Sequence, residues 1–316
     1  MKKLYFPLIL ACSLLADMVM VSCAGLGEKV DLRLRLEQGK TYKIRMVNDQ
    51  KTKLTAQGRE MEMSQKMGMD FAFDVQEVDE AGDATIKVTF QRISTEMEGP
   101  MGKISYDSAN PTEAEHPMVK GFAAMAGQSY TIIISNKGKA KKVDGMKEIM
   151  TRMLDSLDIP DERMKETMKK QFENMFGDQA TVEMTKQWFG MFPERPVGVG
   201  DSWSKTVFET ARMPMTVENK WTLKERKNGI AFLAVESVIK SNPDAEPMEM
   251  GPMKITMDLS GEQSGTYELD ESTGWIVSSR ITQKIYGEQR IERGPAQEGS
   301  MTIPLSMEST ITLESL

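Results

Sequence analysis

The chain has 316 residues, of which 40% are hydrophobic, and a formal net charge of −7. An acidic chain whose lysines and arginines are interspersed with acids is not expected to bind a nucleic-acid backbone, and its apolar content predicts a folded globular protein. The length suits one large β domain or two related smaller ones.

The first 25 residues predict a bacterial export signal. Two lysines precede a short apolar run, and Met20-Val21-Ser22-Cys23 resembles a lipobox. Cleavage before Cys23 would remove residues 1–22 as a signal peptide and put a lipid on the thiol; cleavage after Ala24 by a general signal peptidase is the alternative. The first interpretation predicts a cell-envelope lipoprotein, anchored to the outer membrane by its lipid and facing the periplasm. The mature chain then has no internal disulfide, so a packed core must stabilise it.

Residues 23–143 predict an N-terminal β half, because apolar and polar side chains alternate along them. Val30, Leu32, Leu34 and Leu36 predict a first strand. The longest stretch is apolar at its odd positions, which are Met61, Met63, Met67, Met69, Phe71, Phe73 and Val75. One-sided strands are typical of antiparallel sheets with one buried face, and long ones must twist and coil.

Residues 144–192 predict a helical insert, because the apolar period changes there from two to 3.6. One helix is expected to begin at Met146, a second follows Pro160, and a short third would carry Val182, Met184, Trp188 and Phe189. The insert fits either a layer that caps the sheet or a mobile lid over a ligand cavity.

Residues 193–316 predict a C-terminal β half that is related to the first. Asn228-Gly229 predicts a hairpin turn, because both residues tolerate positive φ. Gly39-Lys-Thr-Tyr42 resembles Gly200-Asp-Ser-Trp203, and further glycine landmarks follow in the same order. The expected fold is mainly β (α+β): a long antiparallel curved sheet or open barrel from two related β halves, joined edge to edge or face to face, with a helical insert.

Three segments resemble a family of uncharacterised Bacteroidota lipoproteins, an all-β domain of unknown function with a helical insert. They are Pro193-x-x-Pro196-Val-x-Val-Gly200-Asp-Ser-Trp203, the start Val30-Asp-Leu-Arg-Leu, and the strand from Met61 to Met69. The resemblance spans nearly all of the mature chain and implies a Gram-negative envelope setting, but no activity. In such bacteria Asp107-Ser108-Ala109 would be an acceptor site for an O-glycan, which predicts modification of Ser108.

The sequence predicts no catalytic residue, no cofactor and no metal site. The one histidine, His116, lies in a polar loop before a proline, and the chain contains no Gly-x-Ser-x-Gly elbow. A hydrolase with paired carboxylates remains a third hypothesis, since 47 acidic residues offer many pairs.

Methionine is unusually common, with 28 residues of 316. Pairs such as Met61/Met63 place both thioethers on one face of a strand, which fits core packing, an adaptable apolar cavity or a Cu(I) site. We predict a non-catalytic protein that binds a lipid or another hydrophobic small molecule through Met61, Met63, Met67, Met69, Phe71, Phe73, Trp221 and Met257. A structural or protein-interaction lipoprotein with a closed core and an unknown partner is the alternative.

Overall fold

The computed structural model describes most of the chain beyond the leader. The described residues are 28–56, 58–100, 102–111, 117–157, 161, 165, 166, 169, 173, 177–209, 215–242, 247–250, 253–292 and 300–316. The predicted signal peptide, Cys23 and His116 lie outside these ranges, as does most of the helix expected after Pro160.

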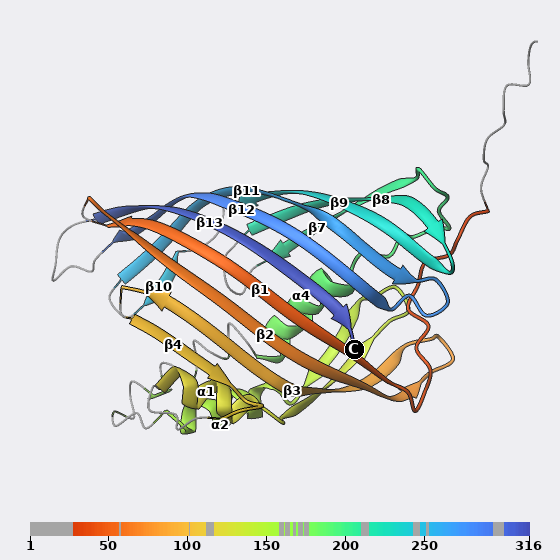
Figure 1. Cartoon of the computed structure of the whole chain (residues 1–316), viewed down its shortest axis with the longest axis horizontal. Coiled ribbons are helices and arrows are strands. Elements are labelled where there is room, and N and C mark those ends of the chain that lie inside the picture. The colour runs from red at the N-terminus through yellow and green to blue at the C-terminus, as the bar shows by residue number, and fades with distance from the viewer. Residues whose placement is uncertain are drawn as a thin grey trace, which may run out of the picture.

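The strands of the described residues form one antiparallel sheet (Figure 1). They are β1 (Thr41–Ala56), β2 (Arg59–Val78), β3 (Ala84–Gly99), β4 (Gly102–Asp107), β5 (Ser129–Ile134), β6 (Ala140–Asp144), β7 (Ser202–Glu209), β8 (Met215–Lys227), β9 (Ile230–Ser241), β10 (Met248–Met250), β11 (Met253–Asp270), β12 (Ile276–Glu292) and β13 (Ser300–Ser315). Their order is β6-β5-β3-β2-β1-β13-β12-β11-β9-β8-β7, with β4 on β3 and β10 on β11. The predicted mainly-β class is confirmed, as an open sheet.

The two β halves meet edge to edge, where β1 pairs with β13. On one side of β13 the strands follow in the order β1-β2-β3-β5-β6, and on the other side, counted from the sheet edge, in the order β7-β8-β9-β11-β12. The halves therefore extend one sheet and do not face each other as a sandwich. The duplication of a β unit stays a prediction.

Local sequence explains the hairpin between β8 and β9. Asn228 and Gly229 have φ values of 55° and 76°, both in the left-handed region, as the dipeptide predicts. From this turn β9 continues with alternating buried and exposed side chains, which gives the sheet one apolar face.

Two glycines mark where the sheet is tightly packed against itself. A Cβ atom on Gly261 would lie 2.4 Å from the carbonyl oxygen of Lys284, and one on Gly265 would lie 2.1 Å from that of Arg280. Only glycine fits such a close backbone approach between β11 and β12. The long strands arch together, and Figure 1 shows the sheet curling around the helix α4.

Three helices are described: α1 (Pro117–Met125), α2 (Met146–Asp155) and α4 (Asp178–Phe189). Helix α4 packs against β6 and β7, the two edge strands of the sheet, while α1 packs against α2 and β3. The predicted insert is therefore present as α2 and α4, and it lies on the apolar, concave side, which we call the inner face. Helix α1 was not expected from the apolar period.

Residues 30–36 form an extended segment instead of the predicted strand. Val30 makes an isolated bridge with Val197, and the Leu34 N–H donates to the carbonyl oxygen of Asn136 at 2.7 Å. Leu32, Leu34 and Leu36 are buried. The alternation was read correctly as one buried side, but the backbone groups join separate loops and do not pair with a strand.

One apolar cluster, the main core, lies between the sheet, the helices and this segment. It takes buried side chains from both β halves and from the insert, including Leu34, Phe73, Ile149, Leu233 and Trp275. The two halves therefore share a single core.

Candidate functional site

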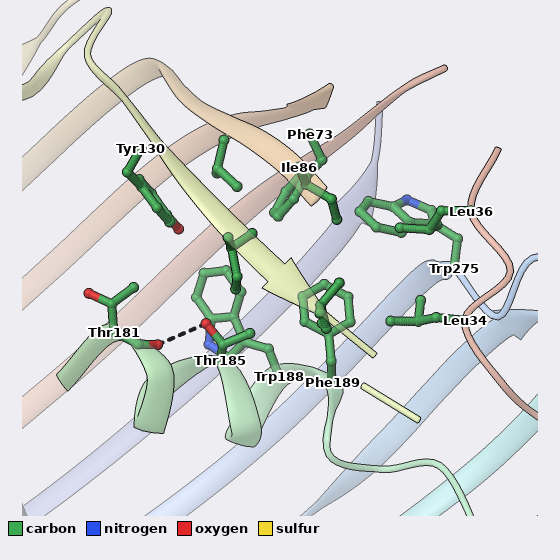
Figure 2. A pocket seen from close by; sticks show the side chains of 13 residues that line it. Leu34, Leu36, Phe73, Ile86, Tyr130, Thr181, Thr185, Trp188, Phe189 and Trp275 are labelled. Atoms are coloured by element: carbon green, nitrogen blue, oxygen red, sulfur yellow. Dashed lines mark hydrogen bonds between the residues drawn. The ribbon is translucent and has the colours of Figure 1, made fainter. Parts of the chain in front are cut away.

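Aromatic side chains fill the part of the main core next to α4. Ring centroids of Tyr42 and Trp275 lie 4.8 Å apart, those of Phe73 and Trp275 5.2 Å, and those of Phe71 and Trp188 5.6 Å. Tilted and edge-on contacts at such distances stabilise an aromatic cluster beyond the burial of its surface. Figure 2 shows Phe73, Trp188, Phe189 and Trp275 pointing toward one another from the sheet, the helix and the β11–β12 turn.

The cavity within this cluster is small, with a volume of about 30 Å³. This volume has room for about one or two water molecules, not for a lipid. Its polar groups are already committed or neutral: the Thr185 hydroxyl donates to the carbonyl oxygen of Thr181 at 2.8 Å (Figure 2), and burial raises the pKa of Tyr130. The main core is therefore closed at this point.

A continuous row of polar side chains crosses the inner face beyond the main core. We call it the polar row. Neighbouring strands place its members directly opposite one another, in the order Gln65, Gln50, Ser309, Gln283, Gln263, Ser237, Asn219 and Lys205. The row passes from β2 to β7 over seven steps between strands, a span of about 34 Å at the usual strand spacing.

Members of the polar row hydrogen-bond to one another. The Ser237 hydroxyl donates to Asn219 Oδ1 at 2.7 Å, the Gln283 amide to Gln263 Oε1 at 3.4 Å, and the Ser309 hydroxyl to Gln283 Oε1 at 3.4 Å. Ser237, Ser309 and Asn219 are buried, whereas the glutamines of the row are half-buried. Half-buried amides at long hydrogen-bond distances keep donors and acceptors available for a further partner.

Beyond the polar row the inner face is apolar again. Met215, Ile239, Leu259 and Ile285 are buried there in a second cluster, and further side chains around it are half-buried or exposed. We call this zone the distal apolar surface; its partly exposed members are Leu54, Met61, Met63, Val217, Met257, Ile291, Met301, Ile303, Leu305 and Met307. It differs from the main core in that much of its apolar area meets solvent.

Lys205 stands at the β7 end of the polar row and is partly buried, with 28% of its side chain exposed. Its Nζ lies 4.0 Å from Glu194 Oε1, and the other oxygen of that carboxylate pairs with Lys137. Burial lowers the pKa of Lys205, against the effect of Glu194. Two cations thus share one carboxylate, which leaves a positive charge at this end of the row.

All the predicted ligand-binding residues lie on the inner face, but the structure divides them. Phe71, Phe73 and Trp221 are buried in the main core, and Met69 packs against it. Met67 lies between the main core and the polar row, while Met61, Met63 and Met257 belong to the distal apolar surface. Met63 is the most exposed of the set, at 42%. Their role in binding stays a prediction.

Sequence analysis did not find the polar row. Its members come from seven hairpin and cross-sheet pairings, and each one alone is a common break in an apolar stripe, as Gln65 is among the methionines of β2. The signal that sequence contains is one polar residue on the apolar face of every long strand, which acquires meaning only when the strand registers are known.

Ser108 lies in the turn after β4. Its N–H donates to the carbonyl oxygen of Ile93, and its hydroxyl oxygen accepts a hydrogen bond from the Ile93 N–H, both at 2.9 Å. The residue is half-buried. Its glycosylation stays a prediction.

The opposite, outer face is charged. Most residues lining a hollow of about 630 Å³ alternate onto that face, and they carry both signs of charge, as in Glu218, Lys220, Glu236 and Lys284. In the described part of the chain, no three His, Cys, Asp or Glu side chains gather as a set of metal ligands, and no helix has the length and apolar content needed to cross a bilayer.

The model of a family of unknown function, DUF6263, matches residues 81–276, which is more than half of the chain. The chain belongs to this family. The membership covers parts of both β halves and the whole insert, and the DUF6263 family brings no activity with it. No curated protein matches the chain.

Two solved structures are distantly similar. A structure described as "lipid-protein interactions in lipovitellin" is 11% identical, with a TM-score of 0.47, and the match covers 89% of this chain and 25% of that one. The chain thus spans about a quarter of the lipovitellin chain. OccK7 (OpdD) of Pseudomonas aeruginosa is 9% identical, with a TM-score of 0.27, over 88% of this chain and 99% of that one. At these scores neither likeness carries an argument about function.

Proposed function

We propose that this DUF6263 protein is a non-catalytic binding protein that holds a lipid or another hydrophobic molecule on the distal apolar surface. One observation carries the proposal: an apolar zone built by the same strands as the main core remains partly open to solvent. Exposed apolar area of this kind is unfavourable in water, and it marks a surface that has a partner.

The composition of the surface supports a pliable ligand. Met61, Met63, Met257, Met301 and Met307 contribute unbranched thioether side chains that can adapt to varied shapes. The main core offers no comparable room, because its cavity measures about 30 Å³. We therefore assign ligand contact to the methionines beyond the polar row, while Phe71, Phe73 and Trp221 serve the closed core.

The test is Nile red binding to the full-length mature chain, followed by fluorescence. A charge in the middle of the surface should prevent burial of an apolar ligand, so Met257→Glu should weaken binding at least about tenfold. Thr256→Glu is the matched control, because Thr256 is its exposed neighbour on the outer face of β11 and should bind as the wild type does.

Equal binding by the two variants would refute the assignment of this surface. If wild-type protein binds no apolar probe and carries no co-purifying lipid, the rival proposal, a structural lipoprotein that docks another protein, takes its place. In both cases we propose an envelope location, on the evidence of the leader and of Cys23.

A further inference from the structure

The polar row separates two apolar zones of one sheet face. On the main-core side of its β7–β9 end lie Trp203 and Trp221, and on the distal side lie Val207, Val217 and Ile239. A polar side chain placed between apolar rows loses hydration, which costs free energy unless a partner compensates for it. An unbroken row of such residues therefore has a physical cost on a face that would otherwise be uniformly apolar.

A ligand with a polar head and an apolar tail would compensate for that cost. The distal apolar surface begins where the polar row ends, so head and tail would each meet a surface of their own kind. Along β11 the distance from Gln263 in the row to Ile255 near the end of the surface is eight residues, about 27 Å. That length accommodates an extended hydrocarbon chain.

The charge of the head group follows from Lys205. It is the only charged member of the row, it is partly buried, and it shares its carboxylate partner, Glu194, with Lys137. Next to it stand the buried Asn219 and Ser237, whose polar atoms lie on the same face. An incoming carboxylate would complete the pairing of Lys205 with a charge-assisted hydrogen bond in a site of restricted hydration.

Resting on the function proposed above, we infer that the ligand is an anionic amphiphile, whose carboxylate head binds Lys205 at the end of the polar row while its hydrocarbon tail lies along the distal apolar surface. The site thus selects for a fatty-acid-like molecule over a neutral one of the same length.

The experiment compares dodecanoate with dodecanol, two probes that share the tail and differ in the head. Isothermal titration of the full-length mature protein should give one site per chain, and dodecanoate should bind about tenfold more tightly than dodecanol. Lys205→Met should remove that preference and leave dodecanol affinity unchanged, which also shows that the variant is folded. Lys220→Met, one residue from Asn219 on the outer face of β8, is the control and should keep the preference. Acetate, a head without a tail, should not compete.

The outcomes separate the two proposals. If both probes bind and Lys205→Met changes neither affinity, the head-group assignment is wrong, while the function proposed above stands. If neither probe binds to wild-type protein, both proposals fall. Competition by acetate at the affinity of dodecanoate would mean a site for free carboxylates, which also overturns the inference.

Discussion

Single residues on the inner face differ in role according to the row they occupy. Phe71 and Met63 lie on the same side of β2, eight residues apart, yet the first is 3% and the second 42% exposed. Residue type alone does not distinguish them, since both are apolar. Their position relative to the helices and the polar row decides whether they pack or remain open.

At the same scale, one ion pair gives a pH-dependent prediction. Arg92 donates two hydrogen bonds to the carboxylate of Asp107, at 2.9 and 2.6 Å, and lowers the pKa of Asp107 to about 2. Because the folded-state pKa is depressed, the stabilisation is complete above the unfolded pKa of about 4 and is lost as the pH falls toward 2.

Asp107→Asn should lower the free energy of unfolding by about 1 kcal/mol at neutral pH, since the pair is partly exposed. Urea titrations at several pH values should show the difference from wild type shrinking in acid. Asp49→Asn, at an exposed position of β1, serves as the comparison and should change little. A pH-independent loss in the Asp107 variant would argue against the ion pair as its cause.

At the scale of elements, α4 is held where the β5–β6 turn touches its C-terminal end. Gly138 in this turn has a φ of 73°, and a Cβ there would lie 1.7 Å from the carbonyl oxygen of Phe189. The contact explains why the insert follows the sheet edge closely, since any side chain at this position would push the helix away.

Gly138→Ala should therefore cost about 3 kcal/mol of stability, combining backbone strain with the displacement of α4. Gly39→Ala shares the strain, with a φ of 79°, but has no neighbour within 4 Å of the added Cβ, and should cost only about 1 kcal/mol. Thermal unfolding of both variants measures the difference. Equal losses would show that the turn does not restrain the helix.

For the whole molecule, the shared main core predicts a single cooperative unfolding transition. All four tryptophans lie between positions 188 and 275, so their fluorescence reports the insert and the C-terminal half, whereas far-UV circular dichroism reports both halves. The two signals should give the same urea midpoint. Leu34→Ala, in the segment that joins the halves, should shift both midpoints together, with a loss of about 3 kcal/mol. Two separated transitions would mean that the halves fold independently.

The sequence by itself determined the elements that depend on local periodicity and turn chemistry. The alternation from Met61 to Val75 became β2, Asn228-Gly229 became a hairpin turn, and the 3.6-residue period after position 144 became α2 and α4. These features rest on interactions between residues close in sequence, which a pattern can record.

Tertiary structure alone decided which apolar residues are covered and how the polar residues align. The alternation of residues 30–36 is also met by an unpaired extended segment, so pattern could not assign it to the sheet. Gln65 and Lys205 are 140 positions apart in sequence and come to share one row only through the register of eight strands. Because register depends on pairing across the whole sheet, the proposed binding surface is a property of the fold and not of any one segment.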